Sequence, residues 1–153
     1  MKLTNMGKVI DQKEILKSID FSLNQHEIVG LIGRNGSGKP TLFRTISGQY
    51  TPDSGKITID GIDLAIDPTR RAEIFYIDEK ENFLSFYSLK KINQFYLNMY
   101  PKFNQNLFLD LLNQHQLGLN FAYRRMSKGM QGLFQMILAI SSNATYLLLD
   151  EPF

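Results

Sequence analysis

The sequence predicts an α/β fold with a mainly parallel sheet, on three observations. Short apolar runs typical of strands alternate along the chain with stretches of helical period. A glycine-rich loop at 33–38 separates one such run from the helical pattern after it, and the carboxylates Asp150 and Glu151 directly follow the last apolar run. The 153 residues suffice for a buried core, so we expect 1–153 to form a single domain.

The first part of the chain contains the expected strands and one helix. Residues 15–23 alternate between apolar and polar side chains, which favours a half-buried strand, and 56–61 repeats this alternation after turn-forming residues. The continuous apolar run 27–32 predicts a strand that is buried on both faces. Helical spacing over 41–47 predicts a helix that ends at Gly48.

The middle of the chain is predicted to be helical. Residues 89–117 have helical period, and the segment YPKFN at 100–104 divides them into two helices. Aromatic and apolar side chains form a stripe on the first of these helices: Phe95, Tyr96, Met99 and Tyr100. Two interpretations of this stripe stay open, a core face and a face that binds a partner protein.

The last part of the chain predicts a helix followed by a strand. Ser127 is suited to N-cap a helix over 128–140, because its hydroxyl can accept a hydrogen bond from the first helical turn. The apolar run in 145–150 predicts a buried strand. Asp150 and Glu151 then lie at the carboxyl edge of the sheet, where ligands bind in open α/β folds.

Composition excludes several classes of site. The net charge of +2, from 17 basic and 15 acidic residues, shows no strong preference for nucleic acid. The absence of cysteine excludes disulfides and thiolate zinc sites. The most apolar stretch, 133–150, is interrupted by Ser141, Ser142 and Asn143, which leaves it too short to span a bilayer. We therefore expect a soluble, cytoplasmic chain.

Residues 33–39 match the pattern G-x-x-x-x-G-K of a phosphate-binding loop. Gly33, Gly36 and Gly38 let the backbone adopt conformations closed to other residues and bring amide groups close to phosphate oxygens. Lys39 supplies a positive charge to the phosphates, and the N-terminus of the following helix adds N–H groups and its dipole. The loop therefore predicts a nucleotide site.

Pro40 stands where this pattern requires serine or threonine. Proline lacks the hydroxyl that would bind Mg²⁺ and the backbone N–H that would face a phosphate. Its fixed φ nevertheless suits the first turn of a helix. Thr41 carries a hydroxyl one residue further on, at a different angle around the helix axis. We expect a preserved fold with a weakened magnesium site.

Two further segments, together with this loop, resemble the motifs of the ABC ATPases. MSKGMQ at 126–131 is similar to the signature motif in the form found in bacterial export-type members, and YLLLDEPF at 146–153 is similar to the Walker B motif. TPDSGKITIDG at 51–61 resembles a connecting segment of the family, and YPKFN resembles one in the ATPases encoded beside GntR-type regulators. The three motifs also occur in the order and spacing of the family.

The resemblance implies a P-loop NTPase core with a small antiparallel β portion and, at about 85–125, a helical subdomain. It also implies that the family fold continues past Phe153 to a switch histidine, so the C-terminal part of the family fold is missing here. The residues that it implies for ATP binding are Gly33, Arg34, Asn35, Gly36, Ser37, Gly38, Lys39, Pro40 and Thr41.

The resemblance also implies roles around the phosphates. Asp150 would hold Mg²⁺ through water, and Glu151, the implied catalytic residue, would polarise the attacking water. Because these ATPases sandwich two nucleotides between two chains, the signature residues would reach a nucleotide bound to a partner subunit. These signature residues are Ser127, Lys128, Gly129 and Met130.

The strand ending in FYI departs from the family. A glutamine that senses magnesium and the γ-phosphate normally follows it, and here the nearest residues are Asp78 and Glu79. Both carry a carboxylate that can ligate a cation. A carboxylate, however, brings a negative charge to a position where the family has the neutral amide of glutamine. Glu79 is therefore a further candidate magnesium ligand.

The first functional hypothesis is the ATP-binding subunit of an ABC membrane transporter, which couples ATP binding and hydrolysis to export. Its partners would be a second ABC ATPase subunit, in a homo- or heterodimer, and transmembrane subunits docked around 85–120, with no nucleic acid. It would be cytoplasmic and peripheral on the inner face of the cell membrane. Its cofactors would be ATP and Mg²⁺, with magnesium binding impaired.

Two alternatives stay open. One is a truncated or degenerate nucleotide-binding remnant with little or no ATPase activity, because catalysis needs magnesium, water and sensor residues placed together. The other is a soluble ABC ATPase that acts in DNA repair or translation.

Overall fold

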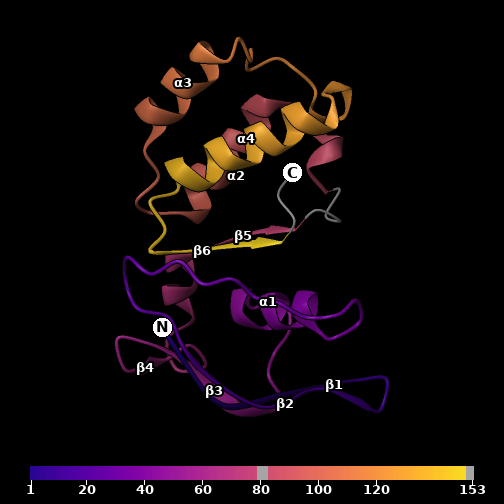
Figure 1. Cartoon of the computed structure of the whole chain (residues 1–153). Helices are drawn as coiled ribbons and strands as arrows, with labels where there is room; N and C mark the ends of the chain where they lie inside the picture. Colours follow the sequence, from indigo (N-terminus) through magenta and orange to yellow (C-terminus); the bar gives the residue numbers. More distant parts are fainter. Residues whose placement is uncertain (79–82, 151–153) are drawn as a thin grey trace. The chain divides into compact units, whose positions relative to one another are not determined.

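The computed structural model describes residues 1–78 and 83–150, which divide after Arg71 into two units (Figure 1). The first unit is Met1–Arg71 and the second is Ala72–Phe153. A short 3₁₀ helix, Pro68–Glu73, joins them along the chain.

The sheet of the first unit is antiparallel and has the strand order β2-β1-β3-β4. Its strands are β1 (Lys2–Ile10), β2 (Lys13–Ser22), β3 (Ser54–Ile59) and β4 (Ile62–Asp63). The alternation in 15–23 and 56–61 thus correctly predicted two of these strands. The antiparallel portion is larger than the small one that we expected, because β1 was not predicted.

The irregular pairing of β1 explains why the sequence pattern did not reveal it. Its register with β2 shifts between Leu3 and Met6, and Asn5 between them has a left-handed backbone with φ 52°. Leu3 and Met6 are both fully buried, which gives a spacing of three where an ideal strand would give two. The bulge therefore hides the alternation.

Helix α1 (Lys39–Ser47) belongs to this unit, and its buried residues are Thr45 and Ile46. It ends at Gly48, as predicted, with a left-handed backbone of φ 89° that glycine adopts without strain. A Cβ added at Gly48 would clash with the guanidinium group of Arg71, so this side chain lies against the end of the helix. The last turn of α1 therefore depends on a glycine for two reasons.

The prediction of a buried strand at 27–32 is wrong. The backbone from Glu27 to Arg34 forms no strand, and Ile28 and Ile32 are almost fully exposed, at 102% and 96%. An apolar run becomes a buried strand only where another strand supplies its backbone hydrogen bonds, and no strand of the described residues pairs with it. Apolar character alone did not contain that information.

The second unit contains a parallel pair, β5 (Ile74–Asp78) and β6 (Tyr146–Asp150), which the α/β prediction required. β6 was expected to be buried, and it is so only at alternate positions: Tyr146 and Leu148 are buried, while Leu147 and Leu149 are 40% and 38% exposed. In Figure 1 the helices of this unit gather on one side of the two strands.

Three helices complete the second unit: α2 (Leu89–Met99), α3 (Gln105–Gln114) and α4 (Lys128–Ser141). The predicted break at 100–104 therefore separates α2 from α3. Each helix begins after a polar N-cap whose side-chain oxygen accepts a backbone N–H of the first turn, namely Ser88, Asn104 and Ser127. Short 3₁₀ helices, Phe83–Phe86 and Tyr123–Arg125, precede α2 and α4.

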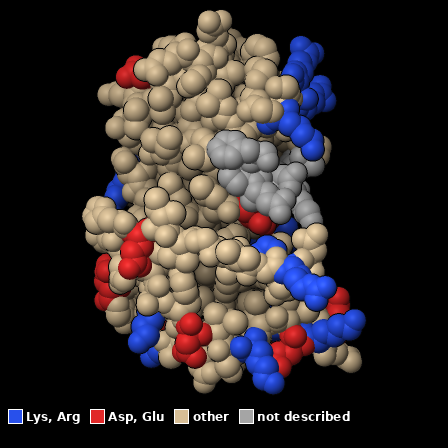
Figure 2. Space-filling view, in the orientation of Figure 1, with Lys and Arg blue, Asp and Glu red and all other residues tan. Residues whose placement is uncertain are grey.

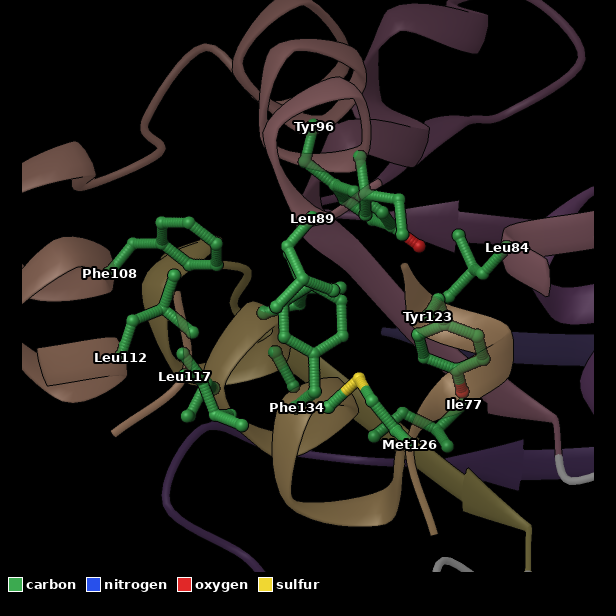
Figure 3. Packing of buried hydrophobic residues seen from close by; sticks show 14 of the residues in the cluster. Ile77, Leu84, Leu89, Tyr96, Phe108, Leu112, Leu117, Tyr123, Met126 and Phe134 are labelled. Carbon is green, nitrogen blue, oxygen red and sulfur yellow. The ribbon is translucent and has the colours of Figure 1, made fainter. Parts of the chain in front are cut away.

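The core of the second unit combines aliphatic side chains with several aromatic ones (Figure 3). Phe134 of α4 has its ring centroid 6.1 Å from that of Phe108 and 5.8 Å from that of Tyr123, both in edge-to-face contact. Edge-to-face aromatic pairs contribute about 1 kcal/mol beyond the area they bury. The contacts therefore join α3, the segment before α4, and α4 itself.

The aromatic stripe of α2 divides between the two interpretations left open by the sequence. Tyr96 and Tyr100 are buried, and the ring centroids lie 5.5 and 5.3 Å from that of Phe75 on β5. Phe95 and Met99 are 48% and 51% exposed. Half of the stripe is thus core, and half is exposed.

Candidate nucleotide site

The glycine-rich loop leads directly into α1. Gly36 and Gly38 have left-handed backbones, with φ 81° and 91°, so the prediction that the loop needs glycine is confirmed at these two positions. Gly33 does not have a left-handed backbone, so the prediction is not confirmed there. Gly38 is also the N-cap of α1, and its carbonyl accepts the first helical hydrogen bond from the Leu42 N–H at 2.8 Å. The Ser37 N–H closes a tight turn by donating to the Arg34 carbonyl at 3.1 Å.

The side chain of Lys39 lies against the loop. Its ammonium donates to the Gly33 carbonyl at 2.7 Å and to the Arg34 carbonyl at 3.4 Å. Residues 33–37 are exposed, whereas Gly38 is buried. The sequence therefore folds locally so that a cation and a solvent-exposed loop backbone meet at the start of a helix, which is an arrangement suited to phosphate.

The N-terminus of α1 has the electrostatics of an anion site but lacks one donor. Its first turn contains no acidic residue, so no side chain there opposes an approaching phosphate. Pro40 follows Lys39 in this turn and contributes neither an N–H nor a hydroxyl. Thr41 is half-buried, and its carbonyl accepts a hydrogen bond from the Thr45 hydroxyl at 2.7 Å.

The signature residues begin α4 in the second unit. Ser127 Oγ accepts the Met130 N–H at 3.3 Å, so the predicted cap is confirmed. Lys128 and Gly129 are exposed. A Cβ added at Gly129 would meet nothing within 4 Å, so no neighbour in the described chain requires a glycine there.

Two glutamines that the sequence did not single out hold this helix start in place. Gln131 Nε2 donates to the carbonyls of Tyr123 and Met126, each at 3.3 Å, and Gln135 Nε2 donates to the Tyr123 hydroxyl at 2.9 Å. Burial raises the pKa of Tyr123, against a smaller lowering by the Gln135 hydrogen bond. The spacing of four between Gln131 and Gln135 places both amides on one face of α4, and this spacing was the feature of the sequence that could have indicated them.

Basic side chains surround the same helix start. Arg124, Arg125 and Lys128 are exposed. Figure 2 shows basic side chains gathered at this end of the second unit, at the upper right of the view, while most of the remaining visible surface of this unit is uncharged. The helix start is therefore positive both through its dipole and through its neighbours.

The carboxyl ends of β5 and β6 bring two aspartates together. Asp78 and Asp150 are the last residues of these strands and are register partners in the parallel pair. Asp78 is only 5% exposed, and Asp150 is half-buried. The candidate residues Glu79 and Glu151 lie outside the described residues.

These two carboxylates fit a divalent cation by their donor chemistry. Mg²⁺ prefers oxygen ligands and is commonly held by one or two carboxylates, with waters and substrate phosphates as the other ligands. In residues 1–78 and 83–150 no group of three or more His, Cys, Asp or Glu side chains is placed to hold a metal. A site with two protein carboxylates therefore matches magnesium better than a metal that needs a complete protein cage.

Comparison with known proteins identifies relatives. Residues 16–153 match the family model described as "ABC transporter". The chain is 32% identical to the ABC transporter ATP-binding protein YtrB of Bacillus subtilis (strain 168), over 99% of this chain and 52% of that protein. It is 28% identical to the lipopolysaccharide export system ATP-binding protein LptB of Haemophilus influenzae, over 97% of this chain and 66% of that protein.

The fold has relatives among solved structures. One, titled "Structure of ATP binding subunit of ABC transporter", superposes with a TM-score of 0.86 at 26% identity, over 99% of this chain and 66% of that one. The predicted α/β class and the predicted family resemblance are thereby confirmed. The chain spans about half to two thirds of the length of these relatives.

Proposed function

Because the chain belongs to the ABC transporter family, we propose that it is the ATP-binding part of an ABC membrane transporter and couples ATP binding and hydrolysis to export. The LptB relative is named as part of an export system. Two other relatives, the ribose import ATP-binding protein RbsA and the sulfate/thiosulfate import ATP-binding protein CysA, are named for import.

The observation that carries the proposal is the loop at 33–41. Left-handed glycines, the Lys39 ammonium and the N-terminus of α1 converge on one exposed loop. The loop amides and the helix dipole would bind the phosphates, and Lys39 would exchange its hydrogen bonds to loop carbonyls for bonds to phosphate oxygens. The residues proposed for ATP are those named from the sequence, Gly33 to Thr41.

The start of α4 is proposed to bind the nucleotide of a second ABC ATPase subunit. Glycine destabilises a helix relative to alanine, and at Gly129 no packing neighbour within the described chain explains it. A missing side chain on an exposed, basic helix start lets a phosphate approach the backbone closely. This supports Ser127, Lys128, Gly129 and Met130 as residues that act in trans in a homo- or heterodimer.

Transmembrane subunits are proposed to dock on the helical region around 85–120. The segments 86–88 and 121–123 lie side by side, because the Tyr123 N–H donates to the Tyr87 carbonyl at 3.1 Å. Large apolar side chains are exposed along this region: Phe86, Tyr87, Phe95, Met99 and Phe121. Exposed apolar groups of this kind suit a protein partner.

Location follows from the same proposal. In residues 1–78 and 83–150 no helix is long and apolar enough to cross a membrane. We propose a cytoplasmic chain that is peripheral on the inner face of the cell membrane and is held there by its transmembrane partners, with no nucleic acid bound.

The catalytic roles complete the proposal. Asp150 would hold Mg²⁺ through water, Glu151 would polarise the attacking water, and Glu79 would be a further ligand. Magnesium would neutralise the charge that develops on the transferred phosphoryl group. Because Pro40 has no hydroxyl, we propose that magnesium binds more weakly here than it would beside serine.

We also propose that 1–153 is one incomplete ABC domain, within which about 85–125 is the helical subdomain. The helices α2 and α3 and the 3₁₀ helix Tyr123–Arg125 support the second part. The alternative of a remnant with little or no ATPase activity is not favoured by the family matches.

Binding of a fluorescent ATP analogue in EDTA tests the proposed function. The chain should bind the analogue, and Lys39→Ala should weaken binding about tenfold or more, because a charge-assisted phosphate contact is lost. Lys56→Ala, which removes an exposed lysine of β3, is the matched control and should bind as the unmodified chain does. Equal binding by Lys39→Ala would place the nucleotide elsewhere.

A further inference from the structure

Asn35 in the glycine-rich loop is the one asparagine of the sequence that precedes a glycine. Asparagine is thermolabile, because the backbone nitrogen of the next residue can attack its side-chain carbonyl and expel ammonia. The attack is easiest before glycine, which has no Cβ to shield its nitrogen. The residue types alone therefore make Asn35 and Gly36 the most reactive pair of this kind in the chain.

The structure leaves both reacting groups open to water. Asn35 and Gly36 are exposed, and a Cβ built on Gly36 would meet no atom within 4 Å. The turn here is closed by its neighbours, since the Ser37 N–H donates to the Arg34 carbonyl at 3.1 Å. Among the described residues, neither the Asn35 side chain nor the Gly36 N–H has a hydrogen-bond partner. Neither group therefore has to give up a hydrogen bond before it reacts.

Asn120 provides a matched contrast within the same chain. Asn120 is also exposed in a turn, but the residue after it is Phe121, whose side chain hinders an attack by its nitrogen. The Phe121 N–H moreover donates to the Gly118 carbonyl at 2.9 Å, and this hydrogen bond would have to break. The two asparagines thus share exposure and differ in the nucleophile.

We infer that Asn35 is a site of spontaneous deamidation and that the reaction inactivates the loop as a phosphate site. The Gly36 nitrogen bonds to the side-chain carbonyl carbon of Asn35, the bond from this carbon to Nδ2 breaks, and the proton of the Gly36 nitrogen ends on the departing ammonia. Water then opens the succinimide ring. Water that breaks the new bond leaves aspartate, and water that breaks the original peptide bond leaves isoaspartate.

The loss of phosphate binding rests on the proposed function of the loop. Both products place a carboxylate in a loop where the Lys39 ammonium and the N-terminus of α1 otherwise favour an anion. Isoaspartate also lengthens the main chain before Gly36 by a methylene group and displaces the loop amides. The added charge should weaken nucleotide binding about tenfold or more. Bound phosphate that accepts the Gly36 N–H would in turn slow the reaction, because this N–H must be lost.

The test is ageing of the full chain at mildly alkaline pH in EDTA, with and without the fluorescent ATP analogue. Enzymatic methylation measures isoaspartate, and peptide mass spectrometry assigns the modification to Asn35 or Asn120. Asn35→Gln is the variant, because its longer side chain forms the corresponding ring much more slowly. Each sample is compared with its own unaged state.

Asn35 should deamidate about tenfold or more faster than Asn120. Analogue at about ten times its Kd leaves about a tenth of the chains free, so the Asn35 rate should fall about tenfold while the Asn120 rate stays unchanged. Analogue binding should decline in step with modification of Asn35. Aged Asn35→Gln should contain no isoaspartate at this position and should bind as it did before ageing.

Two results would overturn the inference: an Asn35 rate within about twofold of the Asn120 rate, or chains modified at Asn35 that bind the analogue as tightly as fresh ones. The rate comparison uses the unmodified chain, so it does not depend on the folding of any variant. Fast deamidation of Asn35 in a chain that binds no analogue when fresh would overturn the proposed function and support the modification site.

Discussion

Replacement of Gly129 by alanine should stabilise the chain and impair its proposed function. Gly129 is the second residue of α4 after Lys128, and an added Cβ would meet nothing within 4 Å. Alanine is favoured over glycine in helices by roughly 0.5–1 kcal/mol, and we take the lower end because the site is in the first turn. A gain of about 0.5 kcal/mol corresponds to a rise of roughly 1–2 °C in melting temperature.

The assay is urea and thermal unfolding followed by circular dichroism, with Ser127→Ala as a comparison of opposite sign. Loss of the Ser127 cap, whose Oγ accepts the Met130 N–H, should lower the free energy of unfolding by about 1 kcal/mol. If Gly129→Ala instead destabilises the chain, the added methyl group meets a neighbour at this position, which contradicts the prediction.

The functional half of this prediction is measured separately. An alanine methyl group at 129 would stand between the helix backbone and a phosphate approaching from a second subunit. ATP-dependent association of two chains, followed by light scattering, should therefore weaken in Gly129→Ala while ATP binding by the single chain stays unchanged. Unchanged association would remove Gly129 from the proposed interface.

Two further predictions concern stability. Gly48→Ala should lower the free energy of unfolding by about 1–2 kcal/mol, because alanine at φ 89° is strained and its Cβ displaces Arg71. Arg71→Ala in the same chain should restore the part of this loss that is due to the clash. If the effects of the two substitutions, measured by chemical denaturation, are fully additive, this explanation is contradicted. Tyr100→Phe should cost about 1 kcal/mol through loss of the 3.1 Å hydrogen bond to the Ile74 carbonyl. Burial raises the pKa of Tyr100 to about 12 from 10.0. The contribution of Tyr100 to the free energy of unfolding is therefore complete below pH 10.0 and is lost as the pH rises toward 12. Tyr100→Phe should lose less stability at alkaline pH than the unmodified chain, and an identical pH profile of the two chains would contradict this role of Tyr100.

Local chemistry in the sequence predicted those parts of the fold whose cause is local. Gly48 ends α1 because glycine tolerates the left-handed backbone, and Ser127 begins α4 because its hydroxyl caps the first turn. Both are decided within a few residues of the chain. The conformation of the loop glycines was predictable for the same reason.

Features that depend on distant partners were not predictable. The run 27–32 has the composition of a buried strand, but a strand also needs a neighbour to pair with, and composition does not specify one. β1 was missed because its bulge at Asn5 breaks the alternation. The pairing of Asp78 with Asp150 depends on the register of strands far apart in sequence, so the sequence named both carboxylates but did not place them next to each other.

Calorimetric titration with ATP, in the presence and absence of Mg²⁺, on this chain and on Pro40→Ser tests whether the loop at 33–41 binds ATP and whether Pro40 weakens the magnesium site. We predict that both chains bind ATP and that Mg²⁺ tightens binding more in Pro40→Ser, because serine restores a hydroxyl ligand and a backbone N–H at the start of α1. An equal effect of Mg²⁺ in both chains would contradict the account of Pro40. Absence of ATP binding in both would contradict the assignment of the loop itself.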